Sequence, residues 1–152
     1  MKIDNVVAGY IVRDNRVLLV HHKLLDEWLP VGGHIDPDET PDDALRREIR
    51  EELGDKIQID FMRYPMPRRG NKRNYALPFF VNVHNMPRDS HVQEKHLHYC
   101  MFYLLTTQTK DRDIKANENE LYRYKWFNEE ELDHPKINQS VRVTCREALE
   151  LV

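Results

Sequence analysis

The chain has 152 residues, of which 40% are hydrophobic and 32% are charged, and its formal net charge is −3 at neutral pH. This length suits one domain with a substantial core, so we expect a single domain over residues 1–152. The acidic balance disfavours a protein that coats nucleic acid, which is normally basic, but permits a small anionic substrate held through a metal ion.

Redox and targeting features favour the cytoplasm. The two cysteines, Cys100 and Cys145, are too few for a disulfide framework and form no C-x-x-C pair for structural zinc. No apolar run is long enough to span a bilayer, and the N-terminal residues lack the clean apolar stretch of a signal peptide. We therefore expect a cytoplasmic protein without a membrane partner.

The chain begins with two strand-like patterns. β-Branched runs at Val6 to Val12 and Val17 to Val20 are joined by Asp14-Asn15-Arg16, which predicts a hairpin. The segment W-L-P-V-G-G at 28–33 is expected to break regular structure.

A helix with clear end signals follows. Thr40 is a good N-cap, Pro41 suits the first helical position, and two aspartates come next at the positive end of the helix dipole. Gly54 is a natural stop. These signals predict a helix over about 41–53.

The rest of the chain is mostly strand-like and ends in a helix. The expected elements are strands at Ile57 to Tyr64, Ala76 to Val83, Leu97 to Thr107 and Tyr122 to Phe127, a helical turn at Asn128 to Leu132, and an amphipathic helix from about Ile137. Many strands with two good helices predict an α+β domain with a mixed sheet.

Three glutamates share one side of the first predicted helix. Glu48 lies three residues before Glu51 and four before Glu52, so their carboxylates can converge and repel one another. A hard cation such as Mg²⁺ would relieve this repulsion, because it prefers carboxylate oxygens, waters and phosphate oxygens. The alternative is a solvated helix face on which the arginines at 46, 47 and 50 screen the glutamates.

The wider spacing favours the metal site. Gly33, five residues, Glu39, seven residues and then R-E-I-R-E-E-L-G at 47–54 resemble the Nudix box, G-x5-E-x7-R-E-U-x-E-E-x-G-U, in which U is aliphatic. Only the last position departs, with Asp55 in place of an aliphatic residue. The W-L-P-x-G-G entry and the later Glu120 are also similar to the family's pattern. The resemblance implies a Nudix-type α/β/α sandwich that includes both ends of the chain.

The resemblance also implies an activity. Nudix hydrolases use Mg²⁺ or Mn²⁺ to cleave the diphosphate linkage of a nucleoside diphosphate joined to another moiety, by attack of water on phosphorus. Here the implied metal ligands are Glu48, Glu51 and Glu52. Our choice of general base is Glu52, with Glu120 as the runner-up or as an extra metal ligand; Glu120 could equally be a solvated loop charge.

Other residues are expected to support the site. Arg47 resembles the family arginine that pairs with the earlier glutamate, here Glu39, and orients the loop and helix. Gly32 and Gly33 are expected to let the backbone turn tightly beside the phosphates. A basic segment (Arg68, Arg69, Lys72 and Arg73) could cover substrate phosphates, although a charge run of this kind is more often an exposed loop.

The histidines at 91, 96 and 98 raise the question of zinc. No acidic or cysteine partner stands at a standard spacing, so a structural zinc site is disfavoured, and a contact with substrate stays open.

Several alternatives remain open at this point. The chain could be a catalytically weak module that senses a nucleotide such as ADP-ribose, although such a sensor has no need of all three metal carboxylates. Action on RNA ends is disfavoured by the acidic balance. Nucleoside triphosphates, ADP-ribose, dinucleoside polyphosphates and nucleotide sugars all remain candidate substrates, and a homodimer is left open.

Overall fold

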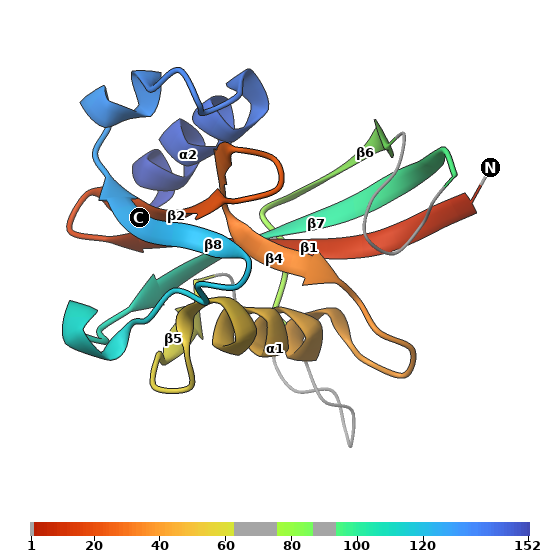
Figure 1. The fold of residues 1–152 in the computed structure, drawn as a ribbon, viewed down its shortest axis with the longest axis horizontal. Helices are drawn as coiled ribbons and strands as arrows, with labels where there is room; N and C mark the ends of the chain where they lie inside the picture. The colour runs from red at the N-terminus through yellow and green to blue at the C-terminus, as the bar shows by residue number, and fades with distance from the viewer. Residues whose placement is uncertain (1, 63–75, 87–93) are drawn as a thin grey trace.

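A mixed β-sheet lies between two helices in this computed structural model, which describes residues 2–62, 76–86 and 94–152 (Figure 1). The helices are α1 (Pro41–Leu53) and α2 (Gln139–Leu151), and the strands are β1 (Lys2–Arg13), β2 (Arg16–His22), β3 (Glu27–Leu29), β4 (Val31–His34), β5 (Ile59–Phe61), β6 (Phe80–Met86), β7 (His96–Thr107) and β8 (Leu121–Phe127). Two short 3-10 helices are η1 (Asp111–Asp113) and η2 (Glu130–Asp133). No helix in these described ranges is long and apolar enough to cross a membrane.

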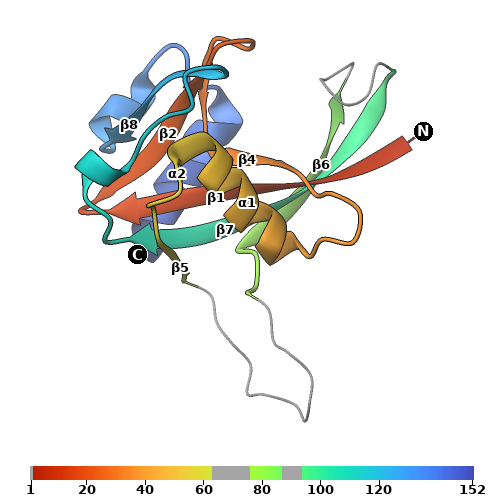
Figure 2. The same ribbon diagram turned by 60° about the horizontal axis from the view of Figure 1, so that its bottom comes forward.

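Strand β1 organises the sheet. It pairs in parallel with β7 along almost its whole length, and its other edge is shared by two antiparallel partners. Strand β4 pairs with β1 from Val6 to Gly9, and β2 pairs with it from Ile11 to Arg13. Strands β3 and β8 extend the sheet from β2, while β5 and β6 pair with β7. Strand β4 thereby lies beside β1 in the sheet, and α1 packs against both strands (Figure 2).

The middle of the sheet is buried on both faces, as the alternation of side chains along β1 from Val6 to Val12 shows. Val6, Tyr10 and Val12 belong to the core beneath α2, whereas Val7 and Ile11 belong to the core beneath α1. Because successive strand residues point to opposite faces, a strand covered on both faces needs apolar residues at nearly every position. The predicted α+β class with a mixed sheet is confirmed.

Most predicted elements are present, with corrections at their ends. The hairpin between β1 and β2 is confirmed; Asp14 and Asn15 form its two-residue turn, with φ of 51° and 59°. The prediction that residues 28–33 break regular structure is wrong, because β3 and β4 flank Pro30. The strand predicted at 76–83 instead covers Phe80–Met86, where pairing with β7 sets its limits.

Candidate active site

Helix α1 carries the candidate site, and its ends are held as the sequence predicts. The Thr40 side chain accepts a hydrogen bond from the backbone N–H of Asp43, and Pro41 begins the helix. Gly54 ends it with φ of 93°, a conformation that favours glycine, and its N–H donates to the carbonyl of Arg50. The prediction of a helix at 41–53 is confirmed.

Packing of α1 against the sheet determines how far each of its three glutamates is exposed to solvent. Leu45, Ile49 and Leu53 face the sheet and are almost completely buried. Since Glu52 lies next to this stripe, only 8% of it is exposed, whereas the Glu48 side chain is 15% exposed and that of Glu51 is 56% exposed. The carboxylates therefore lead from the protein interior to the solvent.

Two glycines of β4 lie in close contact with their surroundings, and both contacts shape the candidate site. The N–H of Gly32 donates to Oε1 of Glu52 at 3.1 Å. A Cβ atom on Gly32 would lie 2.1 Å from the carbonyl oxygen of Val7, and one on Gly33 would lie 2.4 Å from the carboxylate carbon of Glu48. Both positions need glycine because of close approach. The expected tight turn is not observed, because both residues lie in a strand.

Arg47 joins the start of the box to its glutamates. Its Nε and Nη2 donate to the two carboxylate oxygens of Glu39 at 2.8 and 2.9 Å, so the expected pair is present and bidentate. Nη1 donates to Glu48 at 2.9 Å and to Glu51 at 3.3 Å, and Nη2 also donates to the carbonyl of His34 at 2.9 Å. The arginine thus partly screens the carboxylate face, as the alternative reading of the sequence anticipated, while it ties α1 to β4.

Glu120 comes to the site from the segment that precedes β8. Backbone N–H groups of Lys115 and Asn117 donate to the carbonyls of Leu53 and Glu52, both at 2.9 Å, and the N–H of Glu120 donates back to Asn117 at 3.2 Å. These bonds hold the segment against the end of α1. The negative charge of Glu120 contributes to the raised pKa values of Glu48 and Glu52, so the structure brings it together with the box glutamates.

Electrostatics show how poorly the interior tolerates these charges. Burial raises the pKa of Glu48 to about 7; Arg47 opposes this shift, whereas Glu51 and Glu120 add to it. Burial also raises the pKa of Glu52 well above its ordinary value, against the lowering effect of the Gly32 N–H. A divalent cation among these oxygens would favour the ionised forms, and an all-carboxylate donor set suits Mg²⁺ or Mn²⁺. The residues present therefore fit the metal that the sequence pattern implies.

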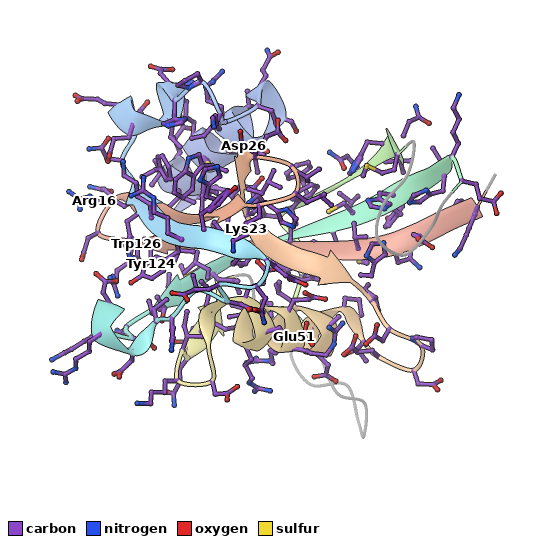
Figure 3. All side chains as sticks on the ribbon, viewed as in Figure 1. Arg16, Lys23, Asp26, Glu51, Tyr124 and Trp126 are labelled. Atoms are coloured by element: carbon purple, nitrogen blue, oxygen red, sulfur yellow. The ribbon has the colours of Figure 1, made fainter. Side chains whose placement is uncertain are left out.

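One cation near the site escaped the sequence analysis. The backbone N–H of Lys23 donates to the carbonyl of Glu120 at 3.0 Å, and its ammonium group donates to the carbonyl of Glu118. In Figure 3 it lies beside the ribbon of β8, and Glu51 lies on α1. A single lysine at the end of a strand gives no signal in the sequence. The predicted phosphate contacts Arg68 and Arg69, with Lys72 and Arg73, lie outside the described residues.

Comparison with known proteins agrees with this geometry. A family model described as the NUDIX domain matches residues 3–146. Nucleoside triphosphatase NudI of Escherichia coli (strain K12 / DH10B) is 29% identical over 154 aligned positions, which cover 96% of each chain. A crystal structure of a NUDIX-family hydrolase from Clostridium perfringens superposes with a TM-score of 0.78 at 24% identity, over 99% of both chains. An ADP-ribose pyrophosphatase from Streptococcus suis has a TM-score of 0.64 at 17% identity, over 97% of this chain and 90% of its own.

Proposed function

Because the chain belongs to the Nudix hydrolase family and is a pyrophosphohydrolase, we propose that it cleaves the diphosphate linkage of a nucleoside triphosphate. The substrate class rests on the likeness to nucleoside triphosphatase NudI along nearly the whole of both chains. We extend the proposal to Mg²⁺ or Mn²⁺ as the cofactor and to residues 1–152 as one catalytic domain.

The observation that carries the proposal is the set of converging carboxylates on α1. Glu48, Glu51 and Glu52 offer oxygen ligands at graded depth, and Glu120 adds a fourth charge from another segment. Raised pKa values at Glu48 and Glu52 mark a site that favours a bound positive charge, which Arg47 supplies in part. When bound there, the metal ion would neutralise charge on the phosphate oxygens and favour attack by water.

Glu52 is the proposed general base. Its Oε1 accepts the Gly32 N–H, which orients the carboxylate, and Oε2 would take the proton from the attacking water. A carboxylate whose pKa is raised by burial is a better proton acceptor than an exposed one. Glu120 is the second candidate for this role, because its charge acts on both Glu48 and Glu52.

Arg47 is proposed as a positioning residue. Its bidentate pair with Glu39 leaves Nη1 directed at Glu48 and Glu51, so the arginine orients these carboxylates. Its bond to the His34 carbonyl holds β4, and with it Gly33, against the helix. Contacts of Arg68 and Arg69 with substrate phosphates stay a prediction.

A substrate panel tests the proposal. Nucleoside triphosphates, ADP-ribose, nucleotide sugars and dinucleoside polyphosphates would each be incubated with Mg²⁺ or Mn²⁺, and the released phosphate or pyrophosphate identified. We expect the highest kcat/KM for a nucleoside triphosphate and no turnover after chelation. A preference for ADP-ribose would refute the substrate class while keeping the hydrolase, whereas nucleotide binding without any turnover would favour the sensor alternative.

A further inference from the structure

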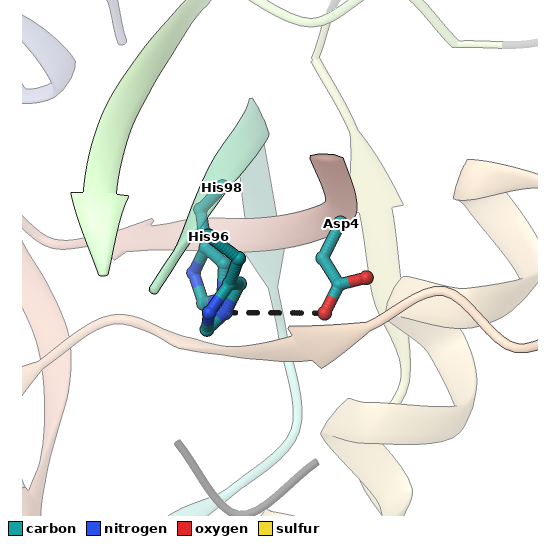
Figure 4. Close-up of side chains that lie close together, drawn as sticks. All are labelled: Asp4, His96 and His98. Atoms are coloured by element: carbon teal, nitrogen blue, oxygen red, sulfur yellow. Dashed lines mark hydrogen bonds and ion pairs between the residues drawn. The ribbon is translucent and has the colours of Figure 1, made fainter. Parts of the chain in front are cut away.

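A second group of potential metal ligands lies at the N-terminal end of β1, far along the sheet from β2. Asp4 of β1 pairs directly with His98 of β7, and His96 points to the same face because it is two residues away. Ligand atoms of these three side chains all lie within 4.8 Å of one another (Figure 4). Both histidines are buried, and the Asp4 side chain is only 14% exposed.

This group is separate from the glutamates of α1. Alternation along β1 places Asp4 on the face that carries Val6 and Tyr10, which is the face covered by α2 further along the strand. Helix α1 packs against the opposite face, where Val7 and Ile11 lie. A ligand bound between Asp4 and the histidines would therefore be divided from the box carboxylates by the sheet.

The distances come close to those around a tetrahedral ion. Nε2 of His96 lies 3.0 Å from Nε2 of His98 and 3.9 Å from Oδ2 of Asp4. Ligand atoms with bonds of 2.0–2.1 Å to a tetrahedral Zn²⁺ ion lie about 3.3 Å apart. All three atoms lie within 4.8 Å of one another, so the side chains would draw together to reach this spacing when an ion binds.

Hydrogen bonding indicates which nitrogen of His96 faces the group. Its Nδ1 lies 2.9 Å from the backbone carbonyl of Glu94. A carbonyl oxygen only accepts, so Nδ1 carries the proton, and in the neutral ring Nε2 presents its lone pair toward His98 and Asp4. Metal-binding histidines generally donate their other ring N–H in this way, which holds the ring in position.

A fourth side chain approaches from β4. Nε2 of His34 lies 3.6 Å from Oδ2 of Asp4, and its ring meets that of His98 edge to face with centroids 5.1 Å apart. His34 could complete a tetrahedral set, or leave the fourth position to water. Because the His34 carbonyl accepts from Arg47, an ion here would also hold the end of β4 beside the candidate active site.

We propose that Asp4, His96 and His98 form a second metal site that binds Zn²⁺ or a similar divalent transition metal. Two imidazole nitrogens and one carboxylate oxygen suit such an ion, whereas Mg²⁺ prefers an all-oxygen set like that on α1. The alternative is a purely structural hydrogen-bonded histidine pair, in which His98 donates to His96 and Asp4 is only a neighbour. That alternative predicts no metal affinity.

Calorimetric titration with Zn²⁺ distinguishes the two. The full chain would be stripped with chelator, returned to excess Mg²⁺ so that the carboxylate site is occupied, and titrated with Zn²⁺. We expect the wild type to bind one Zn²⁺ ion per chain. Loss of a residue that only hydrogen-bonds to a metal ligand typically lowers metal affinity roughly 10- to 100-fold, and Asp4→Asn and His98→Gln should lower the Zn²⁺ affinity by more than this. The control variant Glu51→Gln, which changes a carboxylate of α1 on the other side of the sheet, should bind Zn²⁺ like the wild type.

Binding that is absent from the wild type, or unchanged in both Asp4→Asn and His98→Gln, would overturn the proposal. Should His98→Gln fail to fold, the variant of the partly exposed Asp4 decides. Titration of the wild type with Co²⁺ needs no variant: strong visible absorption indicates tetrahedral coordination with nitrogen ligands, and weak absorption typical of an octahedral oxygen set refutes it. None of these readouts depends on hydrolysis.

Discussion

Substitution of Glu52 by glutamine should affect activity and stability in opposite directions. The amide keeps the size of the side chain and an oxygen that can accept the Gly32 N–H, so the local packing is preserved. It removes a buried negative charge that Glu48, Glu51 and Glu120 all disfavour. It also removes the proposed proton acceptor and one metal ligand.

The expected loss of activity is large. A general base alone contributes about 10²- to 10⁴-fold, which corresponds to about 3–5 kcal/mol of barrier, and loss of a ligand charge adds to this. Steady-state hydrolysis of the best nucleotide at saturating Mg²⁺ measures kcat. The matched control is Glu130→Gln, the same chemical change at an exposed position of η2, which should leave kcat unchanged.

The stability effect should depend on pH. The pKa of Glu52 is higher in the folded than in the unfolded state, so the metal-free wild type loses stability as pH rises above about 4.5. Glu52→Gln does not titrate, so in chelator its Tm should exceed that of the wild type at pH 8, and the difference should be much smaller at pH 5. Each kcal/mol of added stability corresponds to roughly 2–4 °C in Tm for a chain of this length.

Two results would refute this reasoning. A kcat within tenfold of the wild type would assign Glu52 to structure, and the same substitution at Glu120 would then be tested for the base. A lower Tm for Glu52→Gln at pH 8 in chelator would show that the buried charge is compensated in the folded protein.

Three further predictions concern the surroundings of Glu48. In chelator the Tm of the wild type should fall between pH 5 and pH 8, because the pKa of Glu48 is raised from 4.5 to about 7 in the folded protein. This shift corresponds to about 3 kcal/mol, which solvent screening reduces to about 1–2 kcal/mol. Saturating Mg²⁺ should remove the fall, and a Tm that does not change with pH in chelator would contradict the prediction. Glu39→Gln should break the bidentate pair with Arg47 and lower the Mg²⁺ affinity by about 10- to 100-fold in a calorimetric titration. An unchanged Mg²⁺ affinity would show that this pair contributes only to folding. Gly33→Ala should push the Glu48 carboxylate aside and lower kcat/KM more than tenfold, while circular dichroism shows that the fold persists. In Gly32→Ala the new methyl group would meet the backbone of β1, so this variant should have a destabilised fold. Full activity of Gly33→Ala would show that the Glu48 carboxylate can move without loss of function.

The local part of the site could be read from the sequence. The limits of α1 follow from its N-cap, its first-turn proline and its terminal glycine, all of which act within a few residues. The spacing of Glu48, Glu51 and Glu52 puts them on one side of any helix, whatever surrounds it. The pair of Arg47 with Glu39 came from the family pattern, and the structure contains it.

Contacts between distant segments needed the tertiary structure. The sequence did not show that Glu52 is the most buried of the three glutamates, because its burial depends on how α1 lies against Gly32 of β4. The sequence also left Glu120 open between a site residue and a solvated loop charge, because backbone bonds from the segment before β8 to the end of α1 bring it to the site. Each of these facts sets an electrostatic environment, and such environments depend on every neighbour in space.

The histidines show the same division most clearly. The two-residue spacing of His96 and His98 is enough to place both on one face of a strand, but the sequence shows no acidic or cysteine partner at a standard spacing for zinc. The register of β1 beside β7 brings Asp4 opposite His98. That register joins two segments about ninety residues apart along the chain, so no local rule of the sequence fixes it. Local rules therefore determined the helix and its carboxylate spacing, and strand pairing over the length of the chain decided which side chains meet.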